Sequence, residues 1–117
     1  MANGVLLIDK AQDWTSMDVC AKLRGILHER RVGHGGTLDP MATGLLPVFV
    51  GRATRAVQYA TDGKKEYRAV LRLGLVTDTQ DVTGAVLSQR AADVSREVLE
   101  AVLPQFRGEN FQGPPMY

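Results

Sequence analysis

The chain has 117 residues, of which 44% are hydrophobic, so it is long enough for one modest core and we expect a single domain. Its formal net charge of +1 marks the whole chain as neither strongly acidic nor strongly basic. Its longest apolar runs, residues 5–8 and 45–50, fall far short of the roughly 20 residues that a membrane-spanning helix needs.

The beginning of the chain and its cysteine content bear on its compartment. No basic stretch precedes the apolar run at residues 5–8, and acidic Asp9 follows it, so we expect no signal peptide and a cytoplasmic protein. Cys20 is the only cysteine, which rules out an internal disulfide and leaves no C-x-x-C pair for zinc. Its place among apolar helix positions predicts a small buried filler.

The first third of the sequence predicts a strand followed by a helix. Residues 4–8 form a short apolar run typical of a buried strand. Thr15 then offers a hydroxyl cap with Asp18 three residues later, which resembles a capping box. The helix should end near His28, and its apolar positions share one face. These positions are Val19, Leu23, Ile26 and Leu27.

The rest of the chain alternates between strand and helix patterns. We predict an ordered loop at residues 31–40, a strand at 45–50, a short helix through 51–59 and a turn at 62–63. Strands should follow at 66–75 and 85–87, then a helix capped by Ser95 and an aperiodic tail from residue 106. The predicted fold is α+β: a mixed, mainly antiparallel sheet with helices packed on one face and no linker dividing the chain.

Charge is distributed unevenly along the chain. Residues 22–72 hold ten Lys/Arg and four Asp/Glu, a balance of +6, whereas the remaining residues hold four basic and nine acidic side chains, a balance of −5. A surface that faces phosphates would show this asymmetry. A solvated surface of mixed charge explains it equally well.

The segment at residues 31–40 carries the chemistry of the chain. Pro40 disfavours helical angles at Asp39, and the neighbouring glycines permit another backbone to approach closely. An aspartate side chain is ionised at neutral pH, so it can act as a nucleophile without a general base beside it. Arg31 and His34 add a cation and a stackable ring, which suit the holding of a flipped nucleotide.

The residues of this segment also bear on two other interpretations, an ordinary loop and a phosphate-binding loop. A glycine-rich turn with one aspartate and one histidine is, on its own, more often an ordinary ordered loop than a site. A phosphate-binding P-loop is excluded, because no Gly-Lys-Ser/Thr follows the glycines.

Several motifs occur in a fixed order over essentially the whole chain. They are Gly33-His34-x-Gly36-x-Leu38-Asp39-Pro40, Ala42-Thr43-Gly44-x-Leu46, Gly51-x-Ala53-Thr54-Arg55, Lys64-x-x-Tyr67-Arg68, Leu73-Gly74 with Thr77-Asp78-Thr79-x-Asp81, and Phe106-x-Gly108 leading into Gln112-x-Pro114-Pro115-x-Tyr117. In this order and spacing they resemble the TruB family of tRNA pseudouridine synthases. The resemblance implies that residues 1–117 are the amino-terminal part of a catalytic domain, without its carboxy-terminal half or an RNA-binding PUA domain.

The resemblance also implies an activity and roles for individual residues. The activity is isomerisation of uridine to pseudouridine in the T-loop of tRNA, at tRNA position 55, with no cofactor and no metal. Asp39 would be the nucleophile, attacking either the pyrimidine ring or the ribose anomeric carbon. Tyr67 would pack on the flipped base and help remove the ring proton, and His34 would occupy space near the extruded nucleotide. Arg31, as a phosphate or structural contact, joins Gly33 and Gly36 as expected RNA-binding residues.

The chain departs from the family pattern near its start. The family reads Lys-Pro-x-Gly-x-Thr/Ser-Ser where this chain has Lys10-Ala11-Gln12-Asp13-Trp14-Thr15-Ser16. Aspartate in place of glycine should disfavour a positive φ at position 13. Lys10 could be a site lysine, but we expect a structural ion pair. Asp78 and Asp81 loosely resemble a calcium loop, yet lack its alternating acids and final glutamate, so a capped turn is expected.

The residues also allow functions other than catalysis by these 117 residues alone. The chain could be a noncatalytic RNA-binding fragment, because the arginine that pairs with the catalytic acid in this family is absent, and we expect the 117 residues alone to be inactive. Unpaired sheet edges would then favour association with a second copy. A retaining glycosidase using Asp39 lacks an obvious second carboxylate in the same loop.

Overall fold

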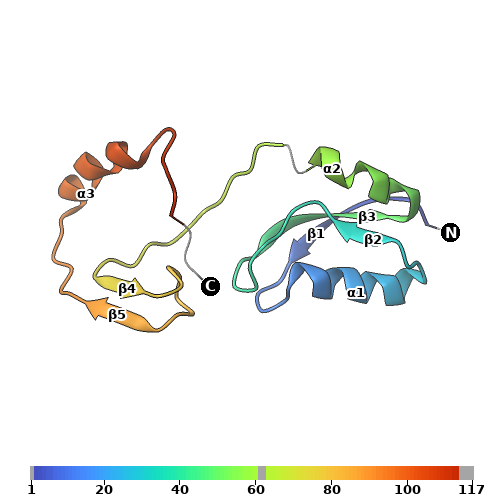
Figure 1. The fold of residues 1–117 in the computed structure, drawn as a ribbon, viewed down its shortest axis with the longest axis horizontal. Coiled ribbons are helices and arrows are strands. Elements are labelled where there is room, and N and C mark those ends of the chain that lie inside the picture. The colour runs from blue at the N-terminus through green and yellow to red at the C-terminus, as the bar shows by residue number, and fades with distance from the viewer. Residues whose placement is uncertain (1, 61–62, 114–117) are drawn as a thin grey trace. The chain divides into compact units, whose positions relative to one another are not determined.

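The computed structural model describes residues 2–60 and 63–113, which form two compact units, Met1–Glu66 (unit 1) and Tyr67–Tyr117 (unit 2). Each unit holds one antiparallel sheet and helical segments, which confirms the predicted α+β class (Figure 1). The boundary lies where a strand was predicted at residues 66–75. That prediction is wrong: residues 64–72 carry no helix or strand, because an alternating pattern forms a strand only beside a pairing partner.

Unit 1 is built on a three-stranded sheet in the order β1-β3-β2. The strands are β1 (Gly4–Lys10), β2 (Val32–His34) and β3 (Gly44–Val50), with β3 antiparallel to both neighbours. β1 pairs along its whole length, from Gly4 opposite Val50 to Lys10 opposite Gly44. β2 lies within residues 31–40, which were predicted to form a loop. The loop prediction is wrong for these three residues, because the glycine at the centre of β2 interrupts the alternation that is typical of a strand.

Helix α1 (Ser16–Leu27) begins and ends where the sequence predicted. The Asp18 N–H donates to the Thr15 hydroxyl and the Thr15 N–H donates to the Asp18 carboxylate, each at 2.9 Å, so the capping box is confirmed. These hydrogen bonds hold the pKa of Asp18 below its ordinary value. The helix ends at His28, whose left-handed backbone (φ 52°) closes the last turn.

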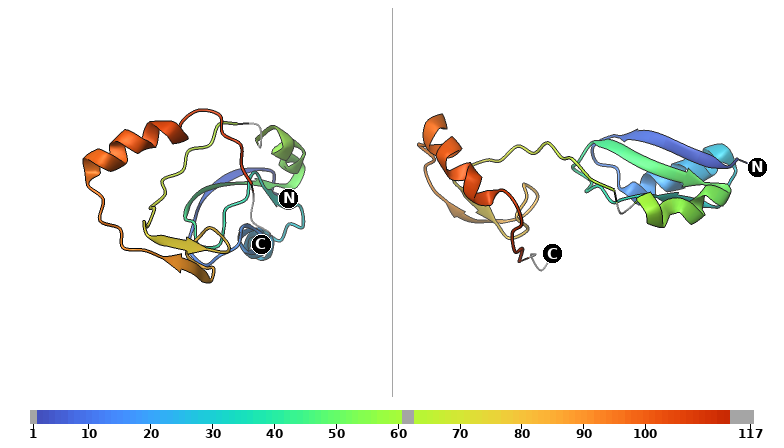
Figure 2. Two further views of the ribbon diagram at one scale, coloured as in Figure 1. Left: turned by 60° about the vertical axis from the view of Figure 1, so that its left-hand side comes forward. Right: turned by 90° about the horizontal axis from the view of Figure 1, so that it is seen from above.

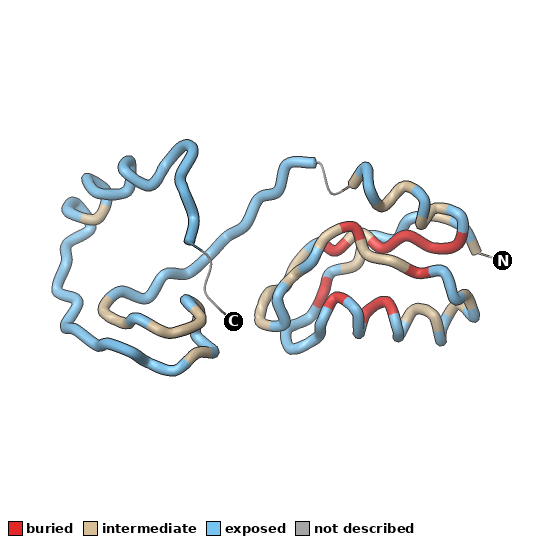
Figure 3. The backbone as a smooth tube through the Cα atoms, in the orientation of Figure 1, coloured by how far each residue is buried: buried red, intermediate tan, exposed pale blue. Residues whose placement is uncertain are grey.

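The core of unit 1 lies between α1 and one face of the sheet. It consists of Val19, Cys20, Val32, Leu46, Val48 and Val50. Figure 3 shows this buried set on α1, β2 and β3. Cys20 is fully buried, as predicted, and burial raises the pKa of its thiol. The prediction that residues 4–8 are a buried strand holds only in part, because Val5 and Leu7 alternate onto the other face and are 51% and 69% exposed.

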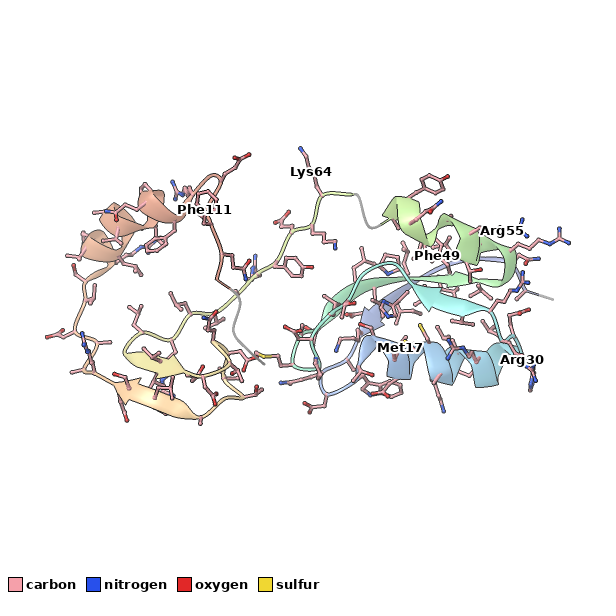
Figure 4. All side chains as sticks on the ribbon, viewed as in Figure 1. Met17, Arg30, Phe49, Arg55, Lys64 and Phe111 are labelled. Atoms are coloured by element: carbon pink, nitrogen blue, oxygen red, sulfur yellow. The ribbon has the colours of Figure 1, made fainter. Side chains whose placement is uncertain are left out.

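The opposite face of the sheet is covered in part by η1 (Gly51–Ala56) and α2 (Val57–Ala60), the short helical segment predicted at residues 51–59. Phe49 alternates with Val48 and Val50, so its buried ring points away from α1 and toward α2 (Figure 4). The two helices therefore cover opposite faces, not one face as predicted. Figure 2 shows α1 and α2 on the two sides of the strands.

Unit 2 contains the hairpin of β4 (Leu75–Thr77) and β5 (Val86–Gln89), then α3 (Arg96–Val102) capped by Ser95, then η2 (Leu103–Phe106). The hairpin and the capped helix confirm the predicted strand near 85–87 and the predicted helix. None of the residues described in this unit is buried. The predicted turn at 62–63 falls partly outside the described residues, as does the end of the tail.

The connection between β4 and β5 is the predicted capped turn. The Asp81 carboxylate accepts hydrogen bonds from the Thr83 hydroxyl, the Thr83 N–H and the Thr79 hydroxyl, and Asp78 Oδ1 accepts from the Ala85 N–H at 2.9 Å. The bond from the Thr83 hydroxyl, followed by that from Thr79, lowers the pKa of Asp81. Both carboxylates are thus committed to the turn itself.

Close packing at Gly35 gives a stability prediction. An added Cβ there would lie 2.7 Å from Phe49 Cε2 and 3.1 Å from Ala60 Cβ, so Gly35→Ala should lower the free energy of unfolding by about 1–3 kcal/mol. Gly25→Ala is the matched control, because its Cβ meets nothing within 4 Å and alanine favours helix; it should be neutral or stabilising by up to ~1 kcal/mol. Urea unfolding measures both, and equal stability of the two variants would contradict this packing.

Candidate functional site

Asp39 lies in the loop between β2 and β3, and its side chain is exposed. No hydrogen bond or ion pair engages its carboxylate among residues 2–60 and 63–113. The group predicted to be the nucleophile is therefore on the surface of unit 1 and open to a ligand. This position agrees with the expectation that Pro40 and the glycines present the side chain at a loop edge.

The backbone on either side of Asp39 is held by the turn that joins β1 to α1. Ser16 Oγ accepts from the Leu38 N–H at 3.0 Å and donates to the Leu38 carbonyl at 3.3 Å, and Ser16 is itself buried. The Pro40 carbonyl accepts from the Asp13 N–H at 2.7 Å. The two turns therefore fix the peptide groups that flank Asp39, while leaving its side chain free of those bonds.

Lys10 joins the same two turns from the inside. Its side chain is 1% exposed, and Nζ donates to the carbonyls of Ala11 at 2.9 Å, Trp14 at 2.6 Å and Pro40 at 3.3 Å. The prediction of an ion pair is wrong, because three carbonyl oxygens take up the three N–H donors of the ammonium group. Lys10 positions the loop of Asp39 and does not face the surface.

Asp13 shows how the chain tolerates its departure from the family pattern. Its φ is 69°, in the left-handed region that the aspartate was expected to disfavour. Aspartate is one of the few residues other than glycine that visits this region. The turn keeps a left-handed residue at position 13, and the Asp13 N–H still reaches the Pro40 carbonyl.

The other predicted site residues are spread along the chain. Gly33 and His34 belong to β2, Gly36 follows in the loop, and His34 Nδ1 hydrogen-bonds the Gly36 carbonyl. Arg31 precedes β2, at the end of that strand away from the Asp39 loop. Tyr67 is 64% exposed and is the first residue of unit 2, so the predicted site is divided between the two units.

Sequence reasoning missed three residues that shape this loop. Ser16 was assigned only to the helix start, and Lys10 was expected to have a carboxylate partner. Gly35 was left out of the site, although its N–H donates to the Pro47 carbonyl at 2.8 Å and no side chain fits beside Phe49. Their spacing gave no signal, since each acts on a segment distant in sequence. The described residues also contain no group of three or more His, Cys, Asp or Glu side chains placed to hold a metal ion.

Comparison with known proteins identifies the family. Residues 24–117 match the family profile described as TruB family pseudouridylate synthase (N terminal domain). This chain belongs to the TruB family. The profile begins after Lys10 and Ser16, but the alignments with individual TruB relatives extend over nearly the whole chain.

The TruB relatives are longer than this chain. It is 52% identical over 115 residues to tRNA pseudouridine synthase B of Chromobacterium violaceum and 47% identical over 115 residues to that of Stutzerimonas stutzeri. Each alignment covers 98% of this chain and 38% of the relative. The chain thus spans less than two fifths of the length of these curated relatives.

Solved structures agree with the TruB assignment. A chain in a Cbf5-Nop10-Gar1 complex matches with a TM-score of 0.66 and 30% identity, covering 97% of this chain and 29% of that one. A chain in an archaeal box H/ACA sRNP Nop10-Cbf5 complex matches with a TM-score of 0.63 and 31% identity, covering 97% and 31%. In the part of this TruB chain that the structure describes, no helix is long and apolar enough to cross a membrane.

The buried lysine yields a prediction for the site. Lys10→Met removes the ammonium group and leaves three carbonyl oxygens without their donor, so it should lower the free energy of unfolding by about 2–4 kcal/mol. Lys22→Met, at an exposed position of α1, removes the same charge and should change stability by less than ~0.5 kcal/mol. Urea unfolding of the two variants tests this, and a Lys10 variant as stable as the Lys22 variant would show that the buried contacts are dispensable.

Proposed function

We propose that this chain is the Asp39-bearing part of an enzyme that isomerises uridine to pseudouridine in the T-loop of tRNA, at tRNA position 55. The observation that carries the proposal is the exposed Asp39 carboxylate on a backbone fixed at both neighbouring residues, in a chain of the TruB family. A loop whose backbone is already held in place needs less reorganisation when the target of its nucleophile arrives, which favours reaction. The names of the curated relatives support tRNA as the substrate.

The proposed reaction rearranges atoms that the substrate already contains. The glycosidic C–N bond breaks, the uracil turns, a C–C bond forms to the ribose, one ring carbon loses a proton and the freed ring nitrogen gains one. Asp39 would hold the intermediate covalently, either through the pyrimidine ring or through the ribose anomeric carbon, and both routes stay open. Since nothing is oxidised or reduced, the proposed enzyme needs no redox cofactor, and we assign it no metal.

The remaining site residues take supporting roles in this proposal. Tyr67 would stack on the flipped base and help remove the ring proton, and His34 would fill space beside the extruded nucleotide. Gly33 and Gly36 would let the RNA backbone approach the loop, and Arg31 would contact phosphate. Because its substrate would be tRNA, we propose that the protein acts in the cytoplasm.

The nucleophile is tested in a chimaera in which these 117 residues replace the matching part of the Chromobacterium violaceum relative. Asp39→Asn keeps the shape of the side chain but removes its anionic oxygen, so pseudouridine in the T-loop should fall below detection while tRNA affinity stays within about twofold. Asp13→Asn is the control, because it neutralises an exposed aspartate of the adjacent turn and asparagine tolerates the same left-handed backbone. Normal product from the Asp39 variant would refute the assigned role.

The alternative is that the 117 residues alone bind RNA without catalysing the reaction. It is favoured by the fact that the chain spans only 38% of the length of the Chromobacterium violaceum relative, and by the absence of a buried residue among those described in unit 2. The same assay separates the two functions: the isolated chain should bind unmodified tRNA and form no pseudouridine. Product from the isolated chain would contradict this alternative.

We further propose that the isolated chain self-associates through the open side of unit 1. Within the described part of the chain, β1 pairs only with β3, so its outer edge offers unpaired N–H and C=O groups. Beside that edge, Val5, Leu7 and Leu45 are 51%, 69% and 65% exposed. An exposed strand edge next to an apolar face is a surface that a second copy can cover.

Self-association is checked by sedimentation velocity over a range of protein concentrations. The chain should shift from monomer to dimer as concentration rises, and Leu7→Lys should weaken the dimer by about tenfold or more, since it places a charge in the apolar face. Ile26→Lys, at a 60% exposed position of α1, is the matched control and should leave the dimer intact. A monomer at every concentration would overturn the proposal.

A further inference from the structure

Four exposed arginines gather at the end of unit 1 opposite the Asp39 loop. Arg30 and Arg31 lie between α1 and β2, and Arg52 and Arg55 lie in η1, directly after β3. Figure 4 shows Arg30 and Arg55 projecting outward at the end of the unit where the chain begins. Two segments that are separated in sequence thus bring four arginines to the same end of unit 1, with Arg30 on the side of α1 and Arg55 on the side of η1; this end is here called the arginine end.

One hydrogen bond joins the two segments of the arginine end, and two more tie the first segment to α1. The Gly51 N–H donates to the Arg31 carbonyl at 2.7 Å. The guanidinium of Arg24 donates to the carbonyls of Arg30 at 3.1 Å and Val32 at 2.8 Å. These bonds use backbone groups of the two segments and the side chain of Arg24, so they leave the four exposed guanidinium groups unengaged.

The charges of the arginine end are not neutralised by the protein. Among residues 2–60 and 63–113, none of the four guanidinium groups forms an ion pair with a carboxylate. Glu29 is the acid closest to them in sequence, and its carboxylate accepts instead from the Arg31 backbone N–H at 3.2 Å. Exposed cations that no carboxylate neutralises attract anionic ligands.

The Asp39 end of unit 1 has the opposite character. Its exposed charged side chains are mainly acidic: the carboxylates of Asp9, Asp13, Asp18 and Asp39 outnumber the ammonium group of Lys22, and Lys10 is buried. These carboxylates repel the phosphates of a polyanion that approaches the reacting carboxylate. The arginine end, whose unpaired cations attract phosphate, lies about 20 Å away along the seven residues of β3.

From this separation of charge we infer that the arginine end binds the sugar-phosphate backbone of the RNA substrate at a point remote from the target uridine. The inference rests on the proposed function for its substrate class. Phosphate contacts position a nucleic acid without reading its sequence. Arginines at one end of unit 1 would hold the RNA while a loop of that RNA reaches Asp39 at the other end.

The test is the salt dependence of binding between the isolated chain and an unmodified tRNA transcript. Replacing Arg30, Arg31, Arg52 and Arg55 by glutamine should lower the slope of log K against log[salt] by about 3, since each lost phosphate contact removes about 0.7–0.9. The double variants R30Q/R31Q and R52Q/R55Q should each lower the slope by about half as much as the quadruple variant. The matched control replaces four exposed arginines of unit 2, Arg72, Arg90, Arg96 and Arg107, and should leave the slope unchanged although its net charge falls equally.

Each outcome decides the inference separately from the proposed reaction. A quadruple variant that keeps the wild-type slope overturns it, as does an equal loss in the unit 2 control or a wild-type chain that binds no tRNA. None of these results bears on whether Asp39 forms pseudouridine in the chimaera. The substituted side chains are exposed, and the hydrogen bonds that hold these segments use the backbone or Arg24. An unchanged thermal unfolding transition should therefore accompany the expected result.

Discussion

The ammonium group of Lys10 is the interaction on which the site depends. It is buried in unit 1 and bonded to carbonyls of two turns, one that joins β1 to α1 and one that carries Asp39. A buried cation is costly unless its donors are taken up, and here three carbonyl oxygens take them up. Because the two turns share this one donor group, neither can move independently without leaving a buried polar atom unsatisfied. Ser16 adds a second link between them at Leu38.

This arrangement separates the scaffold of Asp39 from its chemistry. Every hydrogen bond found near Asp39 uses the backbone of its neighbours or its own carbonyl, which accepts from the Ala42 N–H at 2.9 Å. The carboxylate stays exposed and is left for the substrate. Such positioning suits a nucleophile, because the cost of fixing its geometry is met during folding. The charge pattern of unit 1 follows the same division, with carboxylates around the reacting group and exposed arginines at the far end of β3.

Local interactions explain which features the sequence could predict. Helix α1 was predicted at both ends because Thr15, Asp18 and the apolar spacing act within a few residues of one another. The exposure of Asp39 followed from Pro40 and the neighbouring glycines for the same reason. Features that need a distant partner were missed or misread: the short β2 pairs with β3, and Lys10 bonds carbonyls up to 30 residues away.

The wrong strand at residues 66–75 has the same origin. Its alternating pattern is a property of the segment alone, whereas a strand exists only where another strand supplies hydrogen bonds. Gly35 shows why packing could not be predicted from the sequence. No side chain fits at this position because the ring of Phe49, on a neighbouring strand, occupies the space. In each case the missing information was the identity of the contact across the fold.

Amide hydrogen exchange in the native chain tests most directly whether the two turns are held together as described. The N–H groups of Leu38, Asp13 and Ala42 each donate within this network, so all three should be protected, and Ser16→Ala should selectively reduce protection at Leu38. Exchange of these three amides at the rate of an unstructured peptide, while the amides of β3 stay protected, would contradict a fixed backbone around Asp39.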